Sequence, residues 1–263
     1  MIRGVSGLGD GGLMDLGLEG RVALVTGGSK GIGLGIAQAL AAEGAKVAIA
    51  SRNREAVDAA ASELGGAGFV FDSDDLDAIP GLLDDVEAAL GPIDVYIANT
   101  GGPPPNQDPL GFTREEWLSA HRTLVLSPMT ILQRLLPGMR ERGWGRVVLV
   151  ASSAVREPMP ALQLSNVHRP GMIVGFKVLA RQSAADGVTL NTLLPGRIAT
   201  DRMIDTAGSR EAAEEQARET IPAGRLGDIA DMGAAAAFLC SDQAGYITGI
   251  TLLVDGGLTV SVS

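Results

Sequence analysis

A glycine-rich turn near the beginning of the chain has the clearest capacity for chemistry. Its sequence is Thr26-Gly27-Gly28-Ser29-Lys30-Gly31-Ile32-Gly33, and it stands between an apolar run and a segment with helical periodicity. The glycines at 27, 31 and 33 allow the backbone to turn sharply and to approach a ligand closely. A pyrophosphate there would lie against the free N–H groups and the positive dipole end of the helix. The order of strand, loop and helix therefore predicts a dinucleotide-binding turn, where glycines alone would be weak support.

The residues after the next apolar run indicate which dinucleotide is preferred. The run Lys46–Ala50 is followed by Ser51, Arg52 and Asn53. A carboxylate is expected at this point if the ribose carries only hydroxyl groups. Arg52 instead offers a planar set of donors that suits a 2′-phosphate, and Lys30 in the glycine turn can add a second positive charge. We therefore expect NADP(H) to be favoured over NAD(H); the alternative for each cation is a solvated surface charge.

The elements that position these residues follow from an alternation of apolar runs and helical periodicity. The expected strands are Val22–Thr26, Lys46–Ala50, Phe69–Phe71, Ile93–Ala98, Arg146–Ala151, Thr189–Leu194 and Thr251–Val254. The expected helices are Gly31–Glu43, Arg54–Leu64, Leu76–Leu90, Arg114–Arg142, Ser165–Asp186 and Asp228–Leu239. Strands that are apolar on both faces are typical of parallel sheets covered by helices on either side. We predict one α/β domain over residues 20–263, a doubly wound parallel sheet of Rossmann type with about seven strands, after a flexible glycine-rich segment at 1–19.

Composition and charge restrict the classes of partner. The net charge of −10 disfavours binding to nucleic acid or to anionic lipid. No run reaches the roughly 18 apolar residues needed to span a bilayer, and Met1–Gly20 lacks the features of a signal peptide. Cys240 is the single cysteine and is expected to be a buried core residue, and no carboxylate and histidine cluster has the spacing of metal ligands. We expect a cytoplasmic protein that acts on a small molecule without a metal, a membrane or a nucleic acid.

Several separate motifs resemble the short-chain dehydrogenase/reductase family, from about Gly20 to Gly257. The glycine turn matches the family's TGxxxGIG pattern, and the C-terminal ITGxxxxVDGG pattern is met by residues 247–257. The family's adenine-side aspartate, its NAG and its PGxxxT correspond to Asp72, to Asn99-Thr100-Gly101 and to Pro195-Gly196-Arg197-Ile198-Ala199-Thr200. The resemblance implies a nicotinamide-dependent oxidoreductase in which Ile198 and Thr200 face the carboxamide.

The glycine turn, the cationic position and these motifs together give one set of expected cofactor-binding residues. The set is Gly27, Ser29, Lys30, Gly31, Ile32, Gly33, Ser51, Arg52, Asn53, Asp72, Ser73, Asn99, Gly101, Arg169, Pro195, Gly196, Ile198 and Thr200.

The resemblance breaks at the catalytic residues. The family uses an Asn, a Ser and a Tyr-x-x-x-Lys, in which the tyrosine donates a proton to the carbonyl and the lysine lowers its pKa. Counting back from Gly187-Val188-Thr189-Leu190-Asn191 puts the tyrosine position at Ser165 and the lysine position at Arg169. Ser152 lies 13 residues before Ser165, which is the family's usual separation. The asparagine position falls on Leu124, so three of the four positions differ.

These replacements change the chemistry that the site can perform. A serine hydroxyl is far less acidic than a phenol and a guanidinium stays protonated, so the ordinary proton relay cannot run unchanged. Ser152, Ser165 and Arg169 remain the candidate catalytic residues, and Arg169 can bind the nicotinamide ribose or a substrate carboxylate. His168 is an alternative proton donor, and Ser153 competes with Ser152. The run from 164 to 170 resembles a branch with S-N-x-x-R, usually described as oxidoreductases or oxoacyl reductases by homology.

Residues 200–220 are expected to carry the substrate lid, begun by a helix that Thr200 or Asp201 caps. Its members Met203, Ile204 and Ala207, with the proline-rich runs 103–105 and 158–162, predict a mostly apolar pocket. The resemblance also implies a homotetramer or homodimer that pairs through the helices at 114–142 and 165–186.

Two functions stay open. One is an NADP(H)-dependent oxidoreductase that interconverts a carbonyl and a hydroxyl on a mostly apolar substrate, like 3-oxoacyl reductases, with a non-standard proton path. The other is an NADP(H)-binding protein without redox turnover, a sensor or assembly partner. A dehalogenase-like lyase is disfavoured, because that branch keeps the tyrosine and loses the nucleotide loop.

Overall fold

The computed structural model describes residues 15–262 and is built on one parallel β-sheet. The strands are β1 (Val22–Thr26), β2 (Lys46–Ser51), β3 (Ala67–Val70), β4 (Val95–Ala98), β5 (Gly145–Val150), β6 (Val188–Pro195) and β7 (Thr251–Val254). Their order across the sheet is β3-β2-β1-β4-β5-β6-β7, and each neighbouring pair is parallel. The predicted doubly wound, seven-stranded Rossmann-type sheet is confirmed. The order reverses between β1 and β4, so a crevice is expected beyond the ends of these strands.

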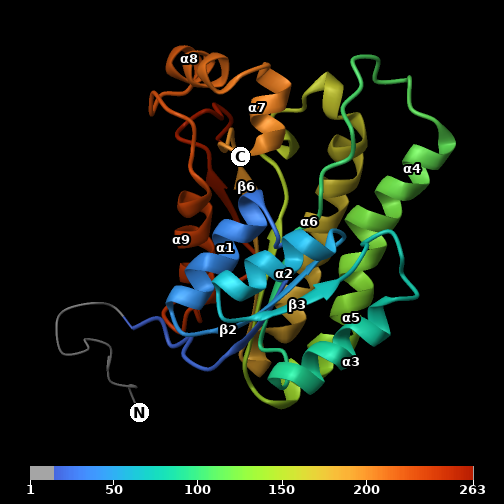
Figure 1. Ribbon diagram of the computed structural model, residues 1–263, viewed down its shortest axis with the longest axis vertical. Helices are drawn as coiled ribbons and strands as arrows, with labels where there is room; N and C mark the ends of the chain where they lie inside the picture. The colour runs from blue at the N-terminus through green and yellow to red at the C-terminus, as the bar shows by residue number, and fades with distance from the viewer. Residues whose placement is uncertain (1–14, 263) are drawn as a thin grey trace.

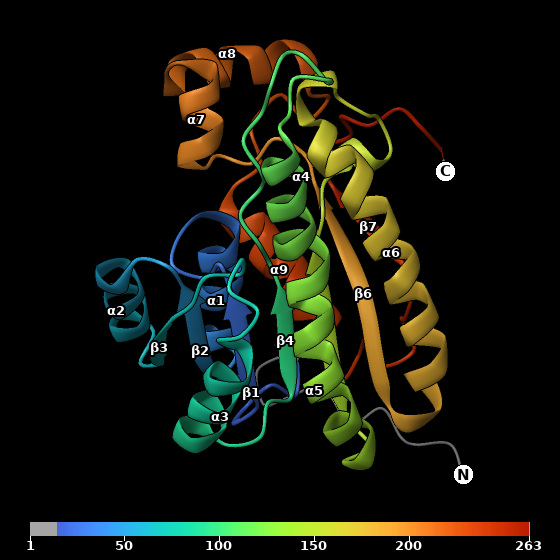
Figure 2. The same ribbon diagram turned by 90° about the vertical axis from the view of Figure 1, so that its right-hand side faces the viewer.

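Helices cover both faces of the sheet (Figures 1 and 2). The helices are α1 (Gly31–Ala42), α2 (Arg54–Glu63), α3 (Ile79–Leu90), α4 (Arg114–His121), α5 (Ser127–Glu141), α6 (Gln163–Ser183), α7 (Asp201–Ala207), α8 (Arg210–Thr220) and α9 (Ile229–Cys240). Side chains of α1, α2 and α9 enter one core cluster, and side chains of α3, α5 and α6 enter the other.

The strands are apolar along their whole length because both faces are buried. In β1, Ala23 and Val25 enter the cluster beneath α1 and α9, whereas Leu24 between them enters the cluster beneath α3, α5 and α6. All five residues of this strand are buried. A fully buried aliphatic side chain contributes about 1.5–3 kcal/mol, so the sheet is a firm base for the loops at its ends. Cys240 is fully buried in the same core, as predicted.

The predicted continuous helix at 114–142 contains a wider turn at its centre. Residues Arg122–Leu126 between α4 and α5 form a π-helical segment. Pro128 has no N–H to donate to the carbonyl group of Leu124 four residues earlier, which breaks the regular α-helical hydrogen-bond ladder.

Several other boundaries differ from the prediction by one to three residues, and two of them have clear local reasons. β3 begins at Ala67 and not at Phe69, because its pairing with β2 starts where Ala67 lies opposite Ala48. α3 begins at Ile79 and not at Leu76, because the side chain of Asp75 accepts a hydrogen bond from the N–H of Ala78 and holds a turn there.

The predicted flexible segment 1–19 lies mainly outside the described residues. Its last part packs on the domain: Leu18 is buried, and the carbonyl of Leu16 accepts a hydrogen bond from the N–H of Asp242. Among residues 15–262, none of the helices is both long and apolar enough to cross a lipid bilayer.

Helices α7 and α8 lie beyond the C-terminal ends of the strands (Figures 1 and 2). Thr200 caps α7, since its side chain accepts from the N–H of Met203. Met203 and Ala207 pack against a small cluster that α8 completes. These two predicted pocket residues therefore face α8, and it is the N-terminal end of α7 that reaches the site described next.

Candidate cofactor and active site

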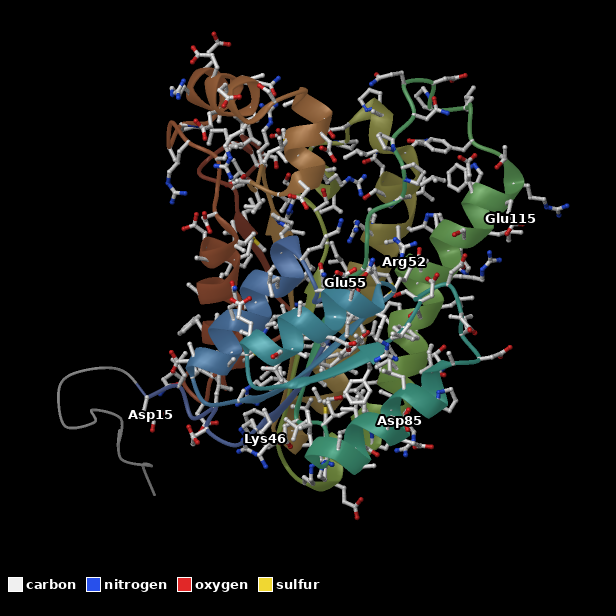
Figure 3. All side chains as sticks on the ribbon, in the orientation of Figure 1. Asp15, Lys46, Arg52, Glu55, Asp85 and Glu115 are labelled. Carbon is white, nitrogen blue, oxygen red and sulfur yellow. The ribbon has the colours of Figure 1, made fainter. Side chains whose placement is uncertain are left out.

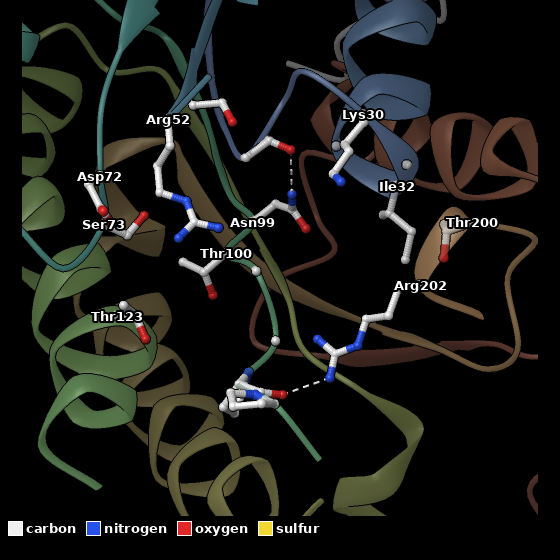
Figure 4. Close-up of a pocket in the computed structure, with 18 of the residues that line it drawn as sticks. Lys30, Ile32, Arg52, Asp72, Ser73, Asn99, Thr100, Thr123, Thr200 and Arg202 are labelled. Atoms are coloured by element: carbon white, nitrogen blue, oxygen red, sulfur yellow. Dashed lines mark hydrogen bonds between the residues drawn. The ribbon is translucent and has the colours of Figure 1, made fainter. Parts of the chain in front are cut away.

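A cleft of about 590 Å³ lies at the C-terminal ends of β1 to β4, between the sheet, α4 and the start of α7 (Figure 4). It is at the crevice expected where the strand order reverses. Twelve of the predicted cofactor-binding residues line it: Gly27, Lys30, Gly31, Ile32, Gly33, Ser51, Arg52, Asp72, Ser73, Asn99, Gly101 and Thr200.

The glycine turn is held in place from β4. The side-chain amide of Asn99 donates to the carbonyl oxygens of Thr26 and Gly27, at 3.2 and 3.1 Å. A Cβ at Gly27 would lie 2.8 Å from this amide nitrogen and a Cβ at Gly33 2.7 Å from it, and Gly27 also has a φ of +59°. Only glycine fits at both positions. The first turn of α1 has no side-chain cap, so its N–H groups are free for an anion in the cleft.

The three residues at the end of β2 have different tasks. The hydroxyl of Ser51 accepts from that of Ser29 at 3.0 Å, and the side chain of Asn53 caps α2 by accepting from the N–H of Ala56. Arg52 is exposed on the cleft wall and makes no hydrogen bond or ion pair with another residue in 15–262. Figure 3 shows it at the end of the strand opposite to Lys46. Of the three, Arg52 alone offers an unpaired charge to a ligand.

The loop after β3 is fixed to α4 by a charged contact. Asp74 accepts from Arg122 Nε at 2.5 Å and from the hydroxyl of Ser119 at 3.0 Å. The hydrogen bond from Arg122 holds the pKa of Asp74 below its usual value, although partial burial opposes this. Asp72 and Ser73, just before Asp74, are thereby held against the cleft.

Six predicted cofactor residues lie outside the cleft wall: Ser29, Asn53, Arg169, Pro195, Gly196 and Ile198. Pro195 ends β6, the N–H of Gly196 donates to the carbonyl of Val254, and Ile198 is buried beside Gly227. Within the PGxxxT segment, Thr200 is the residue that reaches the cleft.

Ser165 and Arg169 lie together on α6, as their spacing of one helical turn requires. Both are buried, and neither they nor Ser152 are among the residues that line the cleft. Arg169 Nε donates to Ser165 Oγ at 2.9 Å, and Nη1 donates to the carbonyl oxygen of Val150, at the end of β5, at 2.8 Å. Arg169 is 7% exposed, and burial lowers its pKa to about 10, with a smaller contribution from the positive charge of Arg202. Because Ser165 Oγ accepts from the guanidinium, its own O–H remains available to donate.

The neighbouring residues of α6 and β5 fix the surroundings of this pair. Asn166 Nδ2 donates to the carbonyl oxygen of Met159 at 2.8 Å and ties α6 to the proline-rich loop before it. Ser152 Oγ accepts from the N–H of Ala154 at 3.2 Å. Ser152 is half-buried whereas Ser153 is buried, so Ser152 is the more accessible of the two candidate serines.

His168 is directed away from Ser165. Its Nδ1 lies 2.7 Å from the carbonyl oxygen of Leu164, and its ring lies 5.7 Å from that of Trp117 and 5.6 Å from that of His121. Trp117 and His121 belong to α4 but are not among the residues that line the cleft. The position of His168 therefore gives no support to a role as proton donor.

No tyrosine takes over from the missing one. The chain has two tyrosines; Tyr96 is fully buried in the core and Tyr246 is fully exposed, and neither lines the cleft. Leu124, at the family's asparagine position, lies in the π-helical segment and is buried. The residues that line the cleft therefore include no tyrosine.

Arg202 is a site residue that the sequence reasoning missed. It lines the cleft from the first turn of α7, and its Nη2 donates to the carbonyl oxygen of Pro103 at 2.7 Å (Figure 4). Arg202 is exposed to solvent, although the atoms packed around its side chain lower the pKa of its guanidinium by partial desolvation. The sequence contained one feature that could have identified it. Arg202 is a positively charged residue two positions after Thr200, at the start of a helix that was already expected to lie over the site.

Comparison with known proteins agrees with this geometry. Residues 27–259 match the family described as enoyl-(acyl carrier protein) reductase. The chain is 35% identical over 247 residues to the 3-oxoacyl-[acyl-carrier-protein] reductase FabG of Haemophilus influenzae, covering 93% of this chain and 100% of that protein. It is 35% identical to the acetoacetyl-CoA reductase of Shinella zoogloeoides, covering 90% and 98%. The chain belongs to the short-chain dehydrogenase/reductase family of oxidoreductases.

Solved structures show the same likeness. The L-sorbose reductase of Gluconobacter frateurii, complexed with NADPH and L-sorbose, superposes with a TM-score of 0.88 at 28% identity, covering 95% of this chain and 100% of that chain. A 3-oxoacyl (acyl-carrier-protein) reductase of Agrobacterium tumefaciens with NADP bound has a TM-score of 0.86 at 32% identity, covering 92% and 96%.

Proposed function

We propose that this protein is an NADP(H)-dependent reductase that interconverts a carbonyl and a hydroxyl group on a small, mostly apolar molecule. The observation that supports the cofactor assignment is the unpaired guanidinium of Arg52 at the end of β2, where a carboxylate would favour an unphosphorylated ribose. The reductases that it resembles include one with NADPH bound and one with NADP bound.

The residues of the cleft fit this cofactor. The free N–H groups at the start of α1 and the room left by Gly27 and Gly33 suit a diphosphate. Arg52, with Lys30 beside the turn, suits a 2′-phosphate, and Thr200 lies toward the nicotinamide end. When bound, the nicotinamide supplies the hydride for the carbonyl carbon.

The proton path is proposed to differ from that of the family. Arg169 donates to Ser165 Oγ, which polarises the serine hydroxyl and leaves its O–H to donate to the substrate oxygen. Such a donor stabilises negative charge as it develops on that oxygen. Ser152 supplies a second hydroxyl, and water delivers the proton, because Tyr96 is buried in the core and Tyr246 is fully exposed.

The cofactor assignment is tested by charge reversal at Arg52. We expect Arg52→Glu to raise the dissociation constant of NADPH at least tenfold and that of NADH no more than about twofold, since a charge-assisted hydrogen bond is worth about 1.5–3 kcal/mol. Fluorescence titration measures both constants. The matched control is Arg54→Glu, an exposed arginine of α2 paired with Asp58 outside the cleft wall. Equal losses for both nucleotides at Arg52→Glu would contradict the assignment.

The second candidate is an NADP(H)-binding protein without redox turnover, and the absence of a tyrosine from the described cleft wall favours it. Oxidation of NADPH with aldehydes, ketones and oxoacyl thioesters separates the two. Turnover that falls about a hundredfold in Ser165→Ala with unchanged NADPH affinity supports the reductase. Tight NADPH binding with no turnover on any of these compounds supports the binding protein.

A further inference from the structure

Arg202 lines the cleft, Arg169 is buried outside its wall, and neither has a carboxylate partner among the described residues. Arg169 donates to the hydroxyl of Ser165 and the carbonyl of Val150, and Arg202 donates to the carbonyl of Pro103. Neither is part of any ion pair among residues 15–262. Burial lowers the pKa of Arg169, and the positive charge of Arg202 lowers it further.

This lack of partners is not caused by a shortage of acids. The chain has 31 acidic and 21 basic side chains. Arg122 and Arg225, for example, each have a carboxylate within hydrogen-bond distance. At the cleft, Glu116 accepts from the N–H and hydroxyl of Thr113, and Asp72 accepts from the N–H of Asp74. Asp201, the third acid on the cleft wall, forms no ion pair with either arginine. Arg202 is exposed and solvated by water, whereas a buried charge such as that of Arg169 is costly without a partner. A ligand anion that displaces the water would compensate both charges.

The loop after β4 is shaped around Arg202. A Cβ placed on Gly102 would collide with Nη1 and the central carbon of the guanidinium. Gly102 thus leaves room for the guanidinium, and the hydrogen bond to Pro103 holds it across the cleft, at the end away from Asp72 and Ser73 (Figure 4). The positive groups assigned to the cofactor phosphates, Arg52 and Lys30, come from other loops. Arg202 is therefore left over once the cofactor is accounted for.

We propose that the substrate carries a carboxylate, which binds to the guanidinium of Arg202 with Arg169 behind it. This inference rests on the proposed function, since it places the substrate beside the nicotinamide end of the cleft. A planar guanidinium matches the two oxygens of a carboxylate. A carboxylate is favoured over a phosphate, because the cofactor already brings a diphosphate and a 2′-phosphate and a further dianion would be repelled more strongly. The substrate is thus an oxo acid or hydroxy acid with an otherwise apolar body.

The test compares matched substrates in Arg202→Gln, which keeps a donor for Pro103 and removes the charge. The compounds are oxo acids with one to four carbons between carbonyl and carboxylate, each paired with its methyl ester. We expect the wild-type protein to prefer the acids, and Arg202→Gln to lower kcat/KM for the acids at least tenfold while changing that for the esters no more than about twofold. Arg202→Lys should retain part of the preference, and Arg210→Gln, on α8, should behave as wild type.

Two binding measurements separate the possible failures. If NADPH affinity falls in Arg202→Gln and the preference for acids over esters does not change, Arg202 belongs to the cofactor site and the inference is wrong. Equal losses for acids and esters also overturn it. Calorimetric titration of the NADP⁺-loaded protein with the corresponding hydroxy acids needs no turnover. Binding that disappears in Arg202→Gln supports the carboxylate site even if no NADPH is oxidised, in which case the proposed reductase activity fails and the inference stands. If only uncharged carbonyl compounds are reduced, the proposed reductase activity stands and the carboxylate site is wrong.

Discussion

Two arginines are buried in this domain, and their surroundings differ. Arg146 of β5 is 3% exposed and donates to the carbonyl oxygens of Ser241, Gly145 and Gly187, with a carboxylate oxygen of Asp242 3.8 Å from Nη2. Arg169 of α6 is 7% exposed and has one carbonyl, one hydroxyl and no carboxylate among the described residues. Burial lowers the pKa of both guanidinium groups, so burial alone does not distinguish them.

The two arginines differ in whether the protein itself supplies the hydrogen-bond and charge partners of the guanidinium group. The guanidinium of Arg146 joins β5 to the residues after α9 and to the loop before β6, and it stacks on the ring of Trp144. A charge satisfied in this way holds a fold together. Arg169 keeps donors available beside a second unpaired cation, which is the arrangement that a ligand completes. The comparison therefore identifies Arg146 as a structural charge, and it is consistent with the ligand-directed role proposed for Arg169.

The largest expected effect is on stability, at Arg146. In Arg146→Met two buried carbonyl oxygens and a partly buried one lose their donor. At about 1 kcal/mol for each unsatisfied group, the low end of the usual range, the loss is about 3 kcal/mol. We expect the melting temperature to fall by roughly 6–12 °C, from about 2–4 °C per kcal/mol for a chain of this size, with NADPH affinity unchanged. Circular dichroism melts and fluorescence titration measure the two. A melting temperature within about 2 °C of wild type would mean that Arg146 is not the structural charge described above.

Arg169→Met is expected to give the reverse result. Loss of the donor to Ser165 should lower kcat about a hundredfold, which is typical for removal of one donor at a developing oxyanion. Removal of an uncompensated buried charge offsets the lost hydrogen bonds, so the melting temperature should stay within about 3 °C of wild type. Steady-state rates and melting curves of the purified variant measure the effects. A fall in melting temperature as large as that of Arg146→Met would show that Arg169, like Arg146, mainly stabilises the fold.

The pKa of Arg169, lowered to about 10, gives a pH dependence with a defined direction. The charged form is disfavoured in the folded state, so the charge is lost as the pH rises through about 10. The unfolded chain keeps this proton to higher pH, so the contribution of the group to stability grows as the pH rises above about 10. We expect rates that are level from about pH 7 to 9 and fall above about 10. Arg169→Lys should move the fall to lower pH, because a buried lysine starts from a lower pKa. Initial rates measured across this pH range test the prediction. If the fall in rate occurs at the same pH in Arg169→Lys, Arg169 is not the group that causes it.

The fold was largely predictable from sequence because parallel strands buried on both faces have continuous apolar runs. All seven expected strands exist, and the first and last have the predicted ends. The errors have local causes. β3 was displaced because Ala67 and Gly68 have weak strand preference and are placed by pairing with β2. The π-helical turn at 122–126 depends on the missing N–H of Pro128 inside an otherwise helical pattern.

The site was predictable where a motif fixes the backbone, and less so where side chains choose their partners. Sequence spacing brought Ser165 and Arg169 together, since both lie on one helix. It could not show that Arg169 would turn toward Val150 on β5, nor that Arg202 would cross to Pro103, because these contacts join segments far apart in the chain. A motif identifies residues that lie near a ligand. It does not show whether their polar side chains bind that ligand or form hydrogen bonds within the protein.

Asn53 is the smallest test of this distinction, since it was predicted to bind the cofactor and is placed as the cap of α2. Its side chain accepts from the N–H of Ala56 at 2.9 Å. Asn53→Ala should cost about 1 kcal/mol, as the loss of a helix cap usually does, and lower the melting temperature by roughly 2–4 °C. The affinities for NADPH and NADH should not change, in contrast to Arg52→Glu one residue earlier. A selective loss of NADPH affinity would show that Asn53 also contacts the 2′-phosphate. Arg52 and Asn53 would then both bind the ligand, and the cap of α2 would have a second role.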